Sequence, residues 1–193
     1  MDRLSALITL VAASSLLACD GGKKEQPVAG RTDTTKVAQK AVSTDAFCDV
    51  HFAGTAGPTF TVPPLVGGTL APTAPTWRWI NVWATWCKPC VEEMPRLAKW
   101  REKLGASYEL AFISIDENDA DVAAFRKAHP DAPASPRLAD PAKQGEWLVS
   151  LGLDSGAPVP IHIFVGPQGH VRCARAGGVR EQDFAAIQKL LAE

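Results

Sequence analysis

Residues 77–104 read WRWINVWATWCKPCVEEMPRLAKWREKL, and this stretch decides the fold. Its first eight residues are apolar or aromatic on both alternations apart from Arg78 and Asn81, which is typical of a strand covered on both faces. From residue 87 onward apolar side chains recur near helical spacing, and Gly105 follows as a stop signal. The sequence therefore predicts a buried central strand that leads directly into a helix at a Cys-x-x-Cys motif.

Cys87 and Cys90 lie at the start of this predicted helix, where unpaired backbone N–H groups and the helix dipole stabilise an anion. A thiolate is such an anion, and the first cysteine of a pair in this setting can have its pKa lowered to about 7 or below. Lys88 adds a nearby positive charge that favours the same ionised state. Cys90 lies one helical turn further on, so it can attack a mixed disulfide formed at Cys87.

The Cys-x-x-Cys motif has two structural alternatives, a zinc site and a static disulfide. Zinc requires a second cysteine pair or a Cys/His pair at short spacing, and the four histidines form no such pair. A static disulfide has no need of a helix start beside Trp86, so this position favours redox chemistry. We expect no metal and no cofactor at the motif.

Other elements alternate along the chain as strands and helices. Strands are predicted over residues 110–115, 161–165 and 170–174, with a four-residue hairpin connection between the last two, and helices over 119–128, 143–151 and 181–192. An additional hairpin is predicted upstream, from residues 60–62 and 69–70, and its two prolines confine it to a sheet edge. Residues 130–141 are proline-rich and are predicted to form a loop.

The amino end indicates export. Residues 4–18 are uncharged and too short to span a bilayer comfortably, as in a signal-peptide core, and residues 16–19 read LLAC, which resembles the lipobox of bacterial lipoproteins. We therefore expect a signal peptide over 1–18, a lipidated Cys19 with a flexible polar tether over 19–44, and a folded domain over 45–193. A plain secretory signal or an uncleaved anchor are the alternatives.

Five cysteines in an exported chain call for a pairing scheme. If Cys19 carries lipid and the Cys-x-x-Cys pair forms locally, Cys48 and Cys173 remain, and we predict a structural disulfide between them. In the chain-entropy model such a bond stabilises the fold by about 4–5 kcal/mol at most. Two free buried thiols are the alternative.

Composition narrows the class of protein. The 193 residues carry 20 basic and 21 acidic side chains and are 46% hydrophobic, which suits one domain with a sizeable core. A net charge of -1 gives no long-range field that would favour nucleic acid. Partners must be recognised by local shape and chemistry.

The active-site stretch WATWCKPCVEEMP over residues 83–95 resembles that of the TlpA/ResA-like thioredoxins, which are membrane-tethered disulfide reductases of the bacterial cell envelope. The resemblance extends from about residue 60 onward and includes Val159-Pro160 before a strand and a Gly-Gly pair before the last helix. It implies an α/β thioredoxin-like fold: a central mixed β-sheet flanked by helices, with an N-terminal β-hairpin extension.

The resemblance also implies roles for residues around the motif. It places Pro160 in a cis peptide bond beside the two cysteines, and Trp86 and the Val159 backbone against an extended client segment. Glu93 stands where ResA-like members carry an acidic residue, so it is a candidate to tune the thiols or to relay a proton to Cys90. An ordinary trans proline and a solvated helix glutamate are the alternatives.

The function implied is a dithiol reductase of exported proteins that contain disulfides, such as clients of cytochrome c maturation or copper-site assembly. An upstream membrane dithiol reductase would recharge the pair, and the protein would be a monomer held by its lipid on the periplasmic side of the membrane. The motif does not set the direction, so a thiol oxidase is an alternative. A copper-binding protein or metallochaperone is another, with His162 as the candidate third ligand.

Overall fold

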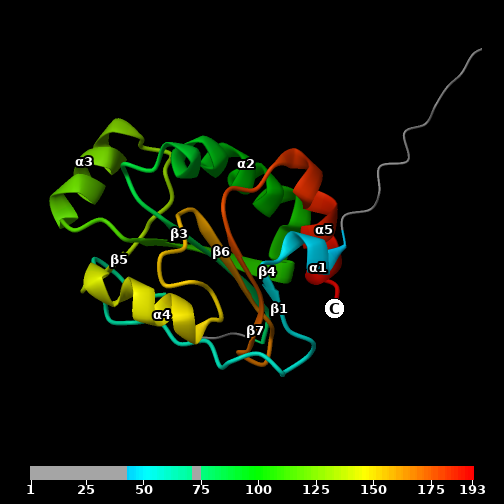
Figure 1. Cartoon of the computed structure of the whole chain (residues 1–193). Helices are drawn as coiled ribbons and strands as arrows, with labels where there is room; N and C mark the ends of the chain where they lie inside the picture. The colour runs from blue at the N-terminus through cyan, green and yellow to red at the C-terminus, as the bar shows by residue number, and fades with distance from the viewer. Residues whose placement is uncertain (1–42, 71–74) are drawn as a thin grey trace, which may run out of the picture. The chain divides into compact units, whose positions relative to one another are not determined.

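A seven-stranded mixed sheet organises residues 43–70 and 75–193, the part of the chain that the computed structural model describes (Figure 1). The strand order is β1-β7-β6-β3-β4-β5-β2. The strands are β1 (Val50–His51), β2 (Leu65–Val66), β3 (Trp77–Trp83), β4 (Tyr108–Ser114), β5 (Arg137–Leu138), β6 (Ile161–Val165) and β7 (Val171–Ala176). The helices are α1 (Thr44–Phe47), α2 (Lys88–Leu104), α3 (Asp119–Ala128), α4 (Gln144–Ser150) and α5 (Phe184–Leu190).

Strand β3 lies at the centre of the sheet, and all of its residues are buried. It pairs in parallel with β4 and antiparallel with β6. Helices cover both faces of this strand: Figure 1 shows α2 and α5 on one face of the sheet and α4 on the other. On the first face, Trp100 of α2 packs against Trp79 of β3 and Phe184 of α5, with ring centroids 6.2 and 5.2 Å away. The central strand and the helix that follows it are confirmed.

The prediction of an N-terminal β-hairpin extension is wrong. Neither residues 60–62 nor 69–70 form a strand, and β1 and β2 lie at opposite edges of the sheet. Strand β2 pairs with β5 instead, Leu65 opposite Leu138, while Thr59 forms an isolated bridge with His170. Proline and glycine signals mark where the chain turns, but they do not say which distant strand supplies the partner.

Several short elements escaped the sequence prediction, among them β5 and α1. The predicted loop over 130–141 contains β5, whose two residues pair with β2 and β4. Helix α1 is four residues long, and the Ser43 hydroxyl caps it by accepting a hydrogen bond from the Ala46 N–H at 3.1 Å. Within the described residues no helix is both long and apolar enough to cross a membrane.

Candidate functional site

Cys87 caps the amino end of α2 with its own sulfur. The backbone N–H of Cys90 donates to Cys87 Sγ at 3.3 Å, and Cys87 has the extended backbone conformation of an N-cap residue. Pro89 occupies the first helical turn, where a missing N–H costs nothing. Cys87 and Cys90 are joined in a disulfide with their Cα atoms 5.3 Å apart, and Cys87 is the more exposed of the two at 4%.

The turn that leads from β3 into α2 is held by a buried carboxylate. Asp116, which follows β4, is 1% exposed and accepts hydrogen bonds from the Thr85 backbone N–H at 3.0 Å and the Thr85 hydroxyl at 2.7 Å. The Ser114 hydroxyl donates to the same carboxylate at 2.6 Å. Because Thr85 lies two residues before Cys87, Asp116 fixes the backbone that delivers the motif to the helix start.

Glu93 points into the protein and not into solvent. Its side chain is 2% exposed, so the alternative of a solvated helix glutamate is wrong. Asn81 Nδ2 donates to Glu93 Oε1 at 2.8 Å, and the Val179 backbone N–H donates to Oε2 at 3.0 Å. His162 Nε2 lies 3.4 Å from Oε1. A buried carboxylate with such donors is satisfied, and its side chain lies one turn along α2 from Cys90.

The predicted client-binding residues gather beside the motif. Trp86 is 68% exposed, and together with Val159 it lines a surface hollow of about 440 Å³. The remaining lining residues are Ile115, Glu117, Pro141, Ala142, Gln144, Ala157 and Pro158. Such an apolar concavity with a few polar groups can take a side chain of an extended segment.

Pro160 follows Val159 in a cis peptide bond, as the resemblance implies. Its carbonyl accepts a hydrogen bond from the Gly177 N–H at 2.8 Å, which ties the loop before β6 to the segment before α5. The adjoining Gly178 approaches both site elements: a Cβ placed there would lie 3.3 Å from Glu93 Oε2 and 3.8 Å from Pro160 Cγ. The missing Cβ of Gly178 therefore lets the chain pass close to Glu93.

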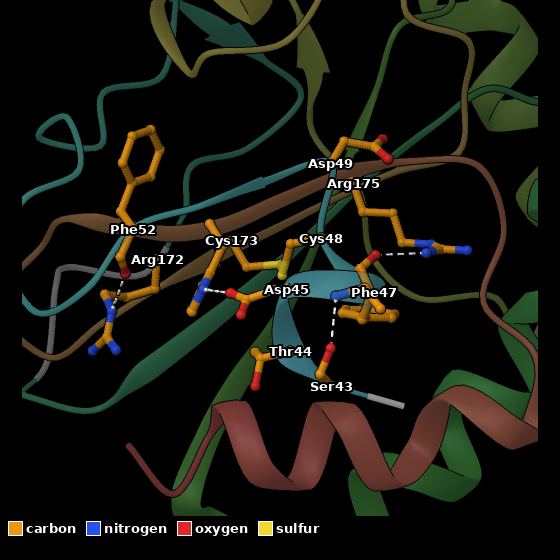
Figure 2. The surroundings of a disulfide bond; sticks show 12 residues. Ser43, Thr44, Asp45, Phe47, Cys48, Asp49, Phe52, Arg172, Cys173 and Arg175 are labelled. Carbon is orange, nitrogen blue, oxygen red and sulfur yellow. Dashed lines mark hydrogen bonds and ion pairs between the residues drawn. A yellow bond between two sulfur atoms is a disulfide. The ribbon is translucent and has the colours of Figure 1, made fainter. Parts of the chain in front are cut away.

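A second disulfide joins Cys48, directly after α1, to Cys173 of β7, with Cα atoms 5.6 Å apart (Figure 2). Arg175 reinforces this clamp, because its Nη1 donates to the Phe47 carbonyl at 2.6 Å and its guanidinium lies over the Phe47 ring. The disulfide and Arg175 therefore fasten the first helix of the described domain to β7, the strand next to the edge strand β1.

Two further predictions concern residues other than the Cys-x-x-Cys pair and its neighbours: lipidation of Cys19 and metal binding by His162. Cys19 and the predicted signal peptide lie outside the described residues. In residues 43–70 and 75–193 no group of three or more His, Cys, Asp or Glu side chains is arranged to hold a metal ion. His162, the candidate third copper ligand, is fully buried against Trp79, Asn81 and Glu93.

Sequence reasoning missed the partners of the site residues. Asn81 and His162 are opposite each other in the register of β3 and β6, which a single sequence does not reveal. One signal could have placed His162 near the site. It lies two residues past Pro160, and alternate residues along an extended chain lie on the same face. The link of Asp116 to Thr85 likewise depends on the parallel pairing of β3 with β4.

This fold and site define a protein of the thioredoxin-like class, with a disulfide pair at the start of a helix that follows the central strand. The chain belongs to the AhpC/TSA family, whose model matches residues 53–174. A solved structure of a DsbF homologue from Corynebacterium diphtheriae shares the fold, with a TM-score of 0.57 and 21% identity over 74% of this chain and 90% of that one.

Two curated relatives match parts of the chain. The chain is 29% identical over 96 residues to the thiol-disulfide oxidoreductase ResA of Bacillus cereus, covering 48% of this chain and 50% of that protein. It is 39% identical over 49 residues to the thioredoxin-like protein YneN of Bacillus subtilis, covering 24% and 29%. The chain thus spans half or less of the length of these relatives. The matches confirm the resemblance to ResA-like thioredoxins.

Proposed function

We propose that the protein is a thiol-disulfide oxidoreductase of the bacterial cell envelope that reduces disulfides in exported proteins. The observation that carries the proposal is the capping of α2 by Cys87, whose sulfur receives the Cys90 N–H at 3.3 Å. The same backbone donor and the helix dipole would stabilise a thiolate on Cys87 once the pair is reduced. The naming of the relative ResA as a thiol-disulfide oxidoreductase supports this reading.

The reaction uses both cysteines in turn. The Cys87 thiolate attacks one sulfur of a client disulfide, which forms a mixed disulfide and releases the other client sulfur as a thiolate. Cys90 then loses its proton and attacks Cys87 Sγ, which forms the Cys87–Cys90 disulfide and releases the client's second thiolate. Two electrons pass to the client, and a membrane dithiol reductase would return them to the pair.

Other residues bind the client and assist the second step. Trp86 and Val159, which both line the 440 Å³ hollow, would hold an extended client segment beside Cys87, with Pro160 shaping the loop. Glu93, buried one turn from Cys90, would take the proton that Cys90 releases. The Cys48–Cys173 bond would be structural, because Cys173 is fully buried.

The sequence supports a layout for the whole chain: a signal peptide over 1–18, a lipidated Cys19 and tether over 19–44, and the redox domain over 45–193, acting as a monomer at the periplasmic side of the membrane. Candidate clients are proteins of cytochrome c maturation or copper-site assembly.

The equilibrium redox potential of the Cys87–Cys90 pair, measured against glutathione or dithiothreitol, tests the proposed direction. A reductase is expected to equilibrate near the values of about -200 mV and below that reducing members of the fold have. A potential above about -150 mV would instead indicate a thiol oxidase. Cys87→Ser, Cys90→Ser and the double variant should each abolish catalytic reduction of insulin, and retained activity in Cys87→Ser would reject the site.

A further inference from the structure

His162 is a fully buried histidine that the reaction above does not use. It lies on β6 opposite Asn81 of β3. Both of its ring nitrogens lie near polar side-chain atoms. Trp79 Nε1 donates to His162 Nδ1 at 3.1 Å, and Asn81 Nδ2 lies 3.4 Å from the same nitrogen. On the other side of the ring, Nε2 lies 3.4 Å from Glu93 Oε1.

The indole of Trp79 decides which nitrogen of His162 carries the proton. An indole N–H can only donate, so Nδ1 must present a lone pair to it, and the proton of a neutral imidazole then resides on Nε2. A proton on Nδ1 would face the Trp79 N–H directly in a site without solvent, where an unmatched donor is costly. The protonated Nε2 then lies on the side of the ring that faces Glu93, 3.4 Å from Oε1, and it makes no hydrogen bond within the described residues.

We propose that His162 is a positioning residue for Glu93, fixed by Trp79 as the Nε2-protonated tautomer and directing that N–H at the Glu93 carboxylate. Asn81 and Val179 supply the two hydrogen bonds to this carboxylate, and the His162 N–H would act on it as a nearby dipole at 3.4 Å. This arrangement also excludes His162 as a copper ligand, because its one lone pair is occupied by the indole. The effect on catalysis rests on the proposed redox function, whereas the tautomer does not.

The tautomer is tested by ¹⁵N NMR of the histidine side chains in the full chain at neutral pH. We expect His162 to be protonated on Nε2 alone, and to lose this preference in Trp79→Phe, which keeps a ring but removes the donor. Trp100→Phe is the matched control, because Trp100 is buried in the same cluster and its indole N–H has no partner among the described residues. An Nδ1-protonated His162 in the wild-type protein overturns the proposal, as does an unchanged tautomer in Trp79→Phe.

The positioning role is tested by the reaction of reduced protein with dithionitrobenzoate, which releases one thionitrobenzoate when Cys87 attacks and a second when Cys90 displaces it. His162→Leu removes the polar N–H beside the Glu93 carboxylate, so it should slow the second release about tenfold and leave the first unchanged. His162→Gln, which can place an amide N–H near the Nε2 position, should restore most of the rate. A second release as fast in His162→Leu as in the wild type overturns the positioning role. If wild-type Cys87 itself fails to react, the proposed function fails while the NMR result stands.

Discussion

At the scale of single residues, Glu93 shows how burial turns an ordinary helix glutamate into part of a site. Its neighbour Glu92 has the same chemistry but is 64% exposed and pairs with Lys88 across one turn at 3.6 Å. Glu93 instead accepts hydrogen bonds from β3 and from the segment before α5. The two adjacent carboxylates are therefore a natural matched pair for experiment.

Glu93→Gln should lower the free energy of unfolding by about 1–3 kcal/mol, because one end of the amide must turn an N–H toward a buried donor. Glu92→Gln should change it by less than about 0.5 kcal/mol, since an exposed ion pair contributes little. Urea unfolding of the two variants measures both effects. Equal stabilities would contradict the buried network around Glu93.

Tyr108 predicts how stability depends on alkaline pH. Burial raises the pKa of Tyr108 to about 12 against an ordinary value of 10.0, while the charge of Arg101 opposes the shift. Up to pH 10 the phenol is protonated in both states, and between pH 10 and 12 only the unfolded chain releases the proton. Stability should therefore fall by about 2–3 kcal/mol across this window.

Tyr108→Phe is the control for this effect, because the phenol oxygen has no hydrogen-bond partner among the described residues. The variant should be close to wild type in stability at neutral pH and lack this part of the alkaline decline. Chemical unfolding at pH 8 and at pH 11.5 checks both expectations. An identical decline in the two proteins would show that other groups cause it.

At the scale of elements, the junction of β3 with α2 depends on the contact between Thr85 and Asp116. Thr85→Val keeps the shape of the side chain but removes the hydroxyl that donates to Asp116 at 2.7 Å, so it should cost about 1.5–3 kcal/mol. Thr85→Ser keeps the hydroxyl and should cost less than about 1 kcal/mol. Thermal or urea unfolding compares the stabilities of the two variants. A Thr85→Ser variant as unstable as Thr85→Val would contradict the hydrogen bond from the Thr85 hydroxyl to Asp116.

Elements could be predicted from the sequence where local signals suffice. The aromatic run before Cys87 and the helical spacing after it lie within one stretch, so β3 and α2 were predicted closely. The pairing of β2 with β5 joins Leu65 to Leu138, and two-residue strands carry no periodicity that would reveal it. The predicted hairpin failed for this reason.

The residues of the candidate site also fall into two groups: those that the sequence alone indicates and those whose surroundings depend on distant contacts. Cys87, Cys90 and Pro160 carry chemical signals that a sequence displays. The environment of Glu93 is assembled by long-range contacts, since Val179 lies 86 residues away, and only the folded sheet brings them together.

At the scale of the whole molecule, the Cys48–Cys173 bond closes a loop across 125 residues and joins α1 to β7 (Figure 2). Replacing both cysteines with serine should lower the free energy of unfolding by up to about 5 kcal/mol, the chain-entropy value for a loop of this length. The redox potential of the Cys87–Cys90 pair should be unchanged. Unfolding and potential measurements on the double variant test the two claims separately.

Thiol counting in denaturant gives an independent check on that bond. After gentle reduction of the Cys-x-x-Cys pair alone, Cys48 and Cys173 should stay unreactive. Four reactive groups from the folded domain would contradict a resistant second disulfide.

The central claim is that the amino end of α2 holds Cys87 as a ready nucleophile. The most direct measurement is the rate at which iodoacetamide alkylates Cys87 in the reduced protein, followed as a function of pH. We expect a half-maximal rate at a pH of about 7 or below, because backbone N–H groups and the helix dipole stabilise the thiolate. A midpoint near the ordinary cysteine value of about 8.5, with reactivity like that of an unstructured peptide, would contradict it.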